Sequence, residues 1–132
     1  MKLTLLFFVI LLPIFSNAQA HLGSSESEIR KTHPDKTFTV SYADDGTKTI
    51  STFMIFGTFY YYISKETGLS YGCVQVIDDM PLLNGQIEAY NGKYVIISDS
   101  EWKAYLEGGG KMKITMTYDS EYEVYVFSYF DI

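Results

Sequence analysis

Short alternating segments separated by turn residues fill most of this chain after residue 36, and this pattern favours a fold rich in antiparallel strands. In residues 36–42, Phe38, Val40 and Tyr42 alternate with threonine and serine, as expected of a strand with one buried face. The Asp-Gly pair at 45–46 supplies the positive φ of a tight hairpin. Further strands are predicted at 47–56, 58–63 and 69–77, with Gly57 as a break and Gly72 as a bulge or a close backbone approach.

Two helices are predicted among these strands. Ser25 and Glu28 have the spacing of a capping box, which begins a short helix that Pro34 stops. Asp78 and Asp79 can cap a second helix that ends near Gly92. Strands then follow at 94–98, around Trp102, at 111–118 and at 122–130.

This order predicts an α+β fold, with two short helices packed on a mostly antiparallel sheet of about six to eight strands. A small β-barrel is the alternative. A helix followed by four strands occurs twice, which suggests a duplication, although the residues of the two halves do not align.

The first residues have the three parts of a secretory signal peptide. Lys2 precedes an apolar run over residues 5–15, and small residues follow at Ser16, Ala18 and Ala20. The run is shorter than the roughly twenty residues that cross a bilayer. We expect cleavage after residue 18, or after residue 20, leaving 19–132 as a single exported α+β domain, periplasmic or extracellular, with no membrane span.

Charge and cysteine content exclude several classes of protein. The formal net charge is −6, and an acidic surface argues against binding to nucleic acid or to anionic membranes. Cys73 is the only cysteine, so no intramolecular disulfide forms. We expect it to be a small buried side chain that alternates with Leu69 and Tyr71.

Candidate catalytic and metal-binding residues are few. A Cys73 nucleophile would need a histidine base, and His21 and His33 lie near the N-terminus outside any known motif. The pairs Asp44-Asp45 and Asp78-Asp79 have ready structural roles as a turn and a cap. His21 near a processed N-terminus suggests a copper ligand, but a solvated tail is the preferred interpretation. We therefore predict no catalytic residue, no metal and no cofactor.

Tyrosine is unusually abundant, with twelve in the chain. Tyr60, Tyr61 and Tyr62 place one ring on one face of their strand and two on the other, and a second aromatic set in the last strand includes Tyr125 and Tyr129. Both faces of these strands are thus apolar, whereas an open antiparallel sheet usually has one wet face. Tyr60, Tyr62, Tyr125 and Tyr129 are the predicted binding residues.

The run from Leu22 to Ser25, the run from Tyr90 to Tyr94, and Trp102 resemble small exported proteins of the Bacteroidota. Their arrangement is similar to the helix-plus-antiparallel-sheet fold of β-lactamase inhibitory proteins and of small outer-membrane assembly lipoproteins. That resemblance implies protein binding, with no catalytic motif to carry over. The leading hypothesis is a non-enzymatic module that binds an envelope or extracellular protein. The alternatives are a binder of glycans or small ligands and, third, a hydrolase.

Overall fold

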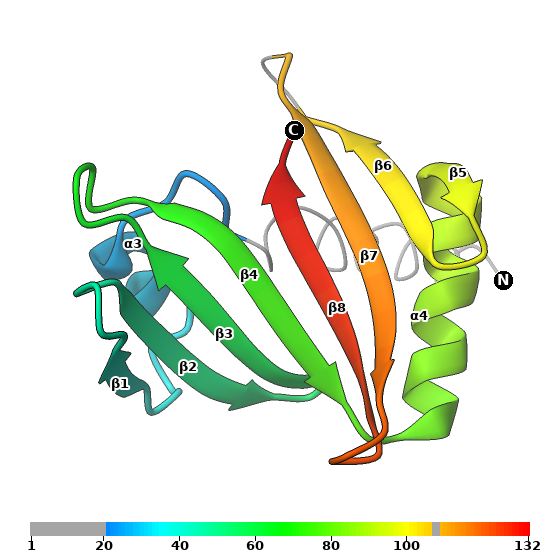
Figure 1. Ribbon diagram of the computed structural model, residues 1–132, viewed down its shortest axis with the longest axis horizontal. Helices are drawn as coiled ribbons and strands as arrows, with labels where there is room; N and C mark the ends of the chain where they lie inside the picture. The colour runs from blue at the N-terminus through cyan, green and yellow to red at the C-terminus, as the bar shows by residue number, and fades with distance from the viewer. Residues whose placement is uncertain (1–20, 107–108) are drawn as a thin grey trace, which may run out of the picture.

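The computed structural model describes residues 21–106 and 109–132, so the predicted leader lies outside the described residues. In this part of the chain the elements are, in order, α3 (Glu26–Thr32), β1 (Thr39–Tyr42), β2 (Lys48–Met54), β3 (Gly57–Ile63), β4 (Ser70–Ile77), α4 (Met80–Lys93), β5 (Val95–Ser98), β6 (Glu101–Tyr105), β7 (Lys111–Asp119) and β8 (Val124–Asp131) (Figure 1). The α+β class and the predicted order of elements are confirmed.

The described strands form one open antiparallel sheet in the order β1-β2-β3-β4-β8-β7-β6-β5. Strands β1 and β5 are its two edges, and closing the sheet would require them to pair with each other. The small β-barrel that we considered as an alternative is therefore wrong.

The sheet consists of two similar halves that meet where β4 pairs with β8. Each half is a helix followed by a meander of four strands, and the second half continues outward from β8 to β5. The buried helix residues Ile29 and Leu83 lie 54 positions apart in the sequence. The buried strand residues Cys73 and Phe127 are also 54 positions apart. The repeated order seen in the sequence is thus a repeated arrangement in space.

Local sequence signals set where both helices begin. The Ser25 hydroxyl accepts from the Glu28 backbone N–H, and the Ser25 N–H donates to the Glu28 carboxylate, each at 3.1 Å. This capping box fixes the start of α3 as predicted. The Asp79 carboxylate accepts from the Leu82 N–H at 3.0 Å and caps α4. The carboxyl groups of Glu28 and Asp79 therefore have a structural role, because they accept backbone N–H groups at the helix N-termini.

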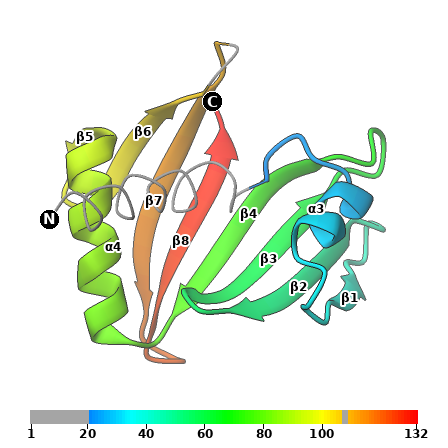
Figure 2. The ribbon, with the colours of Figure 1, turned by 180° about the vertical axis from the view of Figure 1, so that it is seen from behind.

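Both helices pack on the same face of the sheet, here called the covered face. One row of paired residues crosses it from β2 to β6, and every member is less than 7 % exposed: Ile50, Tyr61, Cys73, Tyr129, Ile114 and Trp102. Ile29 from α3, and Leu83 and Tyr90 from α4, complete this core. Figure 2 shows α3 in front of β2–β4 and α4 along the other half of the sheet.

An irregularity in β4 corrects one expectation and confirms another. Pairing with β3 shifts between Tyr62–Gly72 and Ile63–Ser70, so Tyr71 is an extra residue at the bulge predicted near Gly72. Cys73 is fully buried as predicted, but Tyr71 is 44 % exposed and does not share its face. The alternation of Cys73 with Leu69 and Tyr71 was wrong because the bulge displaces the pattern by one residue.

Candidate functional site

The face of the sheet opposite the two helices, here called the open face, is the strongest candidate for a functional surface. Its residues alternate along each strand with those of the covered core. One row of pairs across it consists of Thr49, Tyr62, Gly72, Phe130, Lys113 and Lys103. A neighbouring row consists of Ser51, Tyr60, Val74, Ser128, Thr115 and Glu101.

The β3 tyrosines illustrate how one strand serves both faces. Tyr61 is fully buried in the core, whereas Tyr60 and Tyr62 lie on the open face and are partly exposed. The Tyr62 ring lies 6.2 Å from the ring of Tyr71, which the bulge places on the same face. Partial burial raises the pKa of Tyr62 above its usual value. The predicted sites Tyr60 and Tyr62 therefore belong to an accessible aromatic group.

The Phe130 ring lies close to the backbone of Gly72 on the open face. Phe130 pairs with Gly72, and a Cβ added at Gly72 would come within 2.2 Å of the Phe130 ring. Only glycine allows this approach. Phe130 remains 37 % exposed, so the contact with Gly72 does not remove it from the surface.

Tyr125 and Tyr129 lie on the opposite face from Tyr60 and Tyr62. Tyr129 is 4 % exposed and belongs to the core, so it offers no surface to a partner. Tyr125 is partly buried against the core, and its ring packs 4.9 Å from that of Tyr118. The four predicted binding residues are therefore not brought together. The alternation was read correctly, but α4 covers the face to which Tyr129 points.

Charge on the open face is confined to one end. The strand residues of β2, β3, β4 and β8 on this face are apolar or hydroxyl-bearing, whereas Lys103, Lys111 and Lys113 lie on β6 and β7. Two acidic residues share this face of β6 and β7: Glu101, which is 3.7 Å from the Lys113 ammonium, and Asp119, which pairs with Val124 at the far end of β7. In a chain whose net charge is −6, this end of the open face is locally basic.

A buried polar cluster, which sequence reasoning missed, joins the two halves beneath α4. The Tyr129 hydroxyl donates to Gln75 at 2.5 Å and contacts the Tyr90 hydroxyl at 2.6 Å. Gln75 and Gln86 exchange two hydrogen bonds of 2.8 Å, and Gln75 also donates to the Phe56 carbonyl at 2.7 Å. Burial raises the pKa of Tyr129 well above its usual value.

This cluster is structural, because its polar atoms are used internally. Among the described residues, no buried side-chain nitrogen or oxygen lacks a hydrogen-bond partner. The available signal was a glutamine within a predicted strand, Gln75, and a second glutamine, Gln86, about one helical turn before Tyr90. A buried polar group is expected to find such partners.

The candidate catalytic residues have no catalytic arrangement. Cys73 is fully buried, and burial raises the pKa of its thiol, which keeps it protonated and unreactive. Asp45 accepts from the Thr47 N–H at 2.9 Å within its turn, and Asp79 caps α4. Within residues 21–106 and 109–132, no group of three or more His, Cys, Asp or Glu side chains is arranged to hold a metal ion.

His21 is not a solvated tail residue, which corrects the sequence interpretation. It is only 9 % exposed, and its ring contacts the Tyr61 ring edge-on at 5.6 Å. Its Nε2 atom lies 3.1 Å from Nε2 of His33. The prediction placed His21 in a tail because nothing in the sequence shows that the backbone folds back onto β3.

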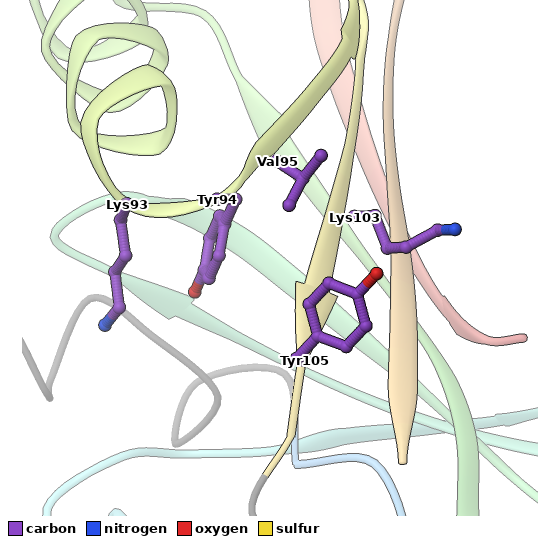
Figure 3. Close-up of a pocket in the computed structure, with 5 residues that line it drawn as sticks. All are labelled: Lys93, Tyr94, Val95, Lys103 and Tyr105. Carbon is purple, nitrogen blue, oxygen red and sulfur yellow. The ribbon is translucent and has the colours of Figure 1, made fainter. Parts of the chain in front are cut away.

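A shallow pocket of about 180 Å³ lies at the β5 edge of the sheet. It is lined by Lys93, Tyr94, Val95, Lys103 and Tyr105, which Figure 3 shows as sticks. The ammonium groups of Lys93 and Lys103 point away from each other in this view. The pocket therefore lacks the convergent polar groups that define a small-molecule site.

Comparisons with known proteins add no assignment. The chain matches no protein-family model, no curated protein and no solved structure. Of the helices in the described part of the chain, none combines the length and the apolar composition needed to cross a membrane.

Proposed function

We propose that this protein is an exported, non-enzymatic module that binds another protein of the envelope or the extracellular space through the open face of its sheet. The observation that carries the proposal is that both helices cover one face. The other face is left with Tyr60, Tyr62, Tyr71 and Phe130 at its centre. Sheets covered on one side normally present polar side chains to water on the other.

The composition of the open face supports a macromolecular partner. Aromatic side chains with polar tips supply large contact areas at low entropic cost and are enriched at protein interfaces. Around them lie threonine and serine hydroxyls, which form the polar rim that such interfaces carry. Phe53, at the end of β2, extends the apolar area and is 73 % exposed.

Charge indicates what kind of protein fits. Lys103, Lys111 and Lys113 occupy one end of the open face, so a complementary partner presents acidic side chains opposite them and apolar side chains opposite the tyrosines. Such complementarity chiefly raises the association rate and selects the partner. The partner proposed is a folded protein with an apolar patch bordered on one side by carboxylates.

The experiment is an affinity capture with matched variants. The purified protein is immobilised and exposed to envelope and culture-medium extracts of its own organism. The test variant combines Tyr60→Ala with Tyr62→Ala. The control combines Tyr42→Ala with Tyr122→Ala, which removes two tyrosines that are 68 % and 71 % exposed and lie off the open face. Circular dichroism verifies that each variant is folded.

We expect the native protein and the control to retain one partner near one-to-one, and the test variant to lose it. Equal retention by the test variant and the control would refute the open face as the interface. If native protein and control retain no protein, and an array of sugars instead shifts their tyrosine and Trp102 fluorescence, the glycan-binding alternative replaces the proposal.

A further inference from the structure

The two histidines of the chain, His21 and His33, form a contact that was not predicted from the sequence. His21 precedes α3, and His33 caps its C-terminal end. Their Nε2 atoms are 3.1 Å apart, and the two rings are perpendicular with centroids 5.2 Å apart. The short helix α3 acts as the connection that turns the chain so that residues twelve positions apart meet. His21 has a φ of 51°, a left-handed conformation that few non-glycine residues adopt.

The surroundings of the pair hold it in place on one side and leave it reachable on the other. His21 is 9 % exposed and rests against Tyr61 of β3. His33 is partly exposed. Burial lowers the pKa of His21 to about 4, and burial also lowers the pKa of His33. Both rings are therefore neutral near pH 7, which is the form of imidazole that binds metals.

We propose that His21 and His33 together bind one divalent transition-metal ion, with Zn(II) and Cu(II) as the ions that fit. Imidazole nitrogens bind Zn(II) at about 2.0–2.1 Å. Two nitrogens 3.1 Å apart, each at that distance from one ion, would subtend an angle of roughly 95–100° at the metal. This value lies between those of square-planar and tetrahedral coordination. Small tilts of the two rings would admit the ion.

The number and type of ligands define the class of ion further. Two imidazoles suit zinc, copper and nickel, whereas calcium and magnesium require oxygen ligands. Two imidazoles leave further coordination positions of the ion to be filled by water or by other ligands. By bridging the segment before α3 to the end of α3, the ion would tie both to β3 and stabilise the folded state by mass action. The site lies on the covered face and is independent of the proposed function.

The test is a titration of the purified, metal-free protein with zinc chloride, followed in two ways. Calorimetry measures stoichiometry and affinity. Nitrogen NMR of protein carrying labelled histidine observes both rings directly, and this readout uses the native sequence alone. His33→Gln is the test variant, and Glu88→Gln, which alters an exposed carboxylate of α4, is the matched control.

We expect one zinc ion per chain, displacement of the Nε2 resonances of both histidines at the same equivalence point, and at least a tenfold weaker affinity in His33→Gln. The Glu88→Gln variant should bind as the native protein does. Unchanged Nε2 resonances at saturating zinc would overturn the proposal, whether or not the variant folds. Equal affinity in His33→Gln and the native protein would overturn it as well.

Discussion

The two faces of the sheet use the same residue type for different purposes. On the covered face, Tyr61, Tyr90 and Tyr129 are buried, and the last two donate and accept hydrogen bonds within a closed polar cluster. On the open face, Tyr60, Tyr62 and Tyr71 expose part of their rings. A buried tyrosine stabilises the fold through ring packing and a satisfied hydroxyl. An exposed one contributes less to stability and remains available for recognition.

The largest expected effect comes from removing a tyrosine of the covered face. Tyr129→Ala leaves a cavity between α4 and the sheet and deprives Gln75 and Tyr90 of a hydrogen-bond partner. We expect a loss of about 3–5 kcal/mol in the free energy of unfolding, measured by urea denaturation. Tyr122→Ala, at a site 71 % exposed, should change it by less than about 0.5 kcal/mol. Similar losses in the two variants would show that Tyr129 is not part of a packed core.

The second-largest effect on the free energy of unfolding is expected from alkaline pH, through the buried tyrosines of the covered face. Burial raises the pKa values of Tyr61, Tyr90 and Tyr129 above the usual value of 10, so the unfolded state releases protons first as pH rises. Stability is therefore complete below pH 10 and declines above it, by roughly 1 kcal/mol per buried tyrosine over the first pH unit. Circular dichroism in urea at pH 9–11 measures the decline. A pH-independent midpoint over this range would contradict the burial.

The contact between Gly72 and Phe130 on the open face leaves no room for a Cβ at residue 72 while the ring keeps its position. Gly72→Ala would push a methyl group into the Phe130 ring, and we expect a loss of about 1–3 kcal/mol. In a Phe130→Ala background the same substitution should cost less than about 1 kcal/mol. Urea denaturation of the four proteins forms a double-mutant cycle. Additive losses would show that the two residues do not touch.

The smallest effect on stability is expected at the basic end of the open face. Lys103→Ala combined with Lys113→Ala removes one partly exposed and one exposed charge, so the free energy of unfolding should change by less than about 0.5 kcal/mol. Capture of the partner should nevertheless become weaker and less sensitive to salt, because steering depends on screened charge. Measuring retention at low and high salt checks this. Unchanged salt dependence would exclude these lysines from the interface.

The helices and strands could be predicted from the sequence, but the face of the sheet that the helices cover could not. Caps at Ser25 and Asp79, the turn at Gly46 and the alternation in β3 act locally, so they could be read directly. Which face the helices cover depends on packing between distant segments. Tyr129 and Tyr62 both lie in strands rich in aromatic and apolar residues. No local signal indicates that Tyr129 is buried and that Tyr62 stays partly exposed.

Three features depended on geometry that no spacing encodes. The bulge at Tyr71 shifts the alternation by one residue only because β3 and β4 pair as they do. The Gln75–Gln86 exchange needs α4 laid across β4. The His21–His33 contact needs the chain before α3 to fold back on Tyr61. Each of these is a contact between segments, whereas sequence patterns describe one segment at a time.

The proposed division of the sheet is that the covered face stabilises the fold and that the open face is available for binding. It is tested most directly by two neighbouring residues of one strand. Tyr61→Ala and Tyr62→Ala remove the same side chain at adjacent positions of β3, one on the covered face and one on the open face. Urea denaturation of the two variants should show a loss of about 3–5 kcal/mol for Tyr61→Ala. For Tyr62→Ala, which is partly exposed, we expect about 1 kcal/mol or less. Equal losses, or the larger one at Tyr62, would contradict the assignment of the open face as a surface free for binding.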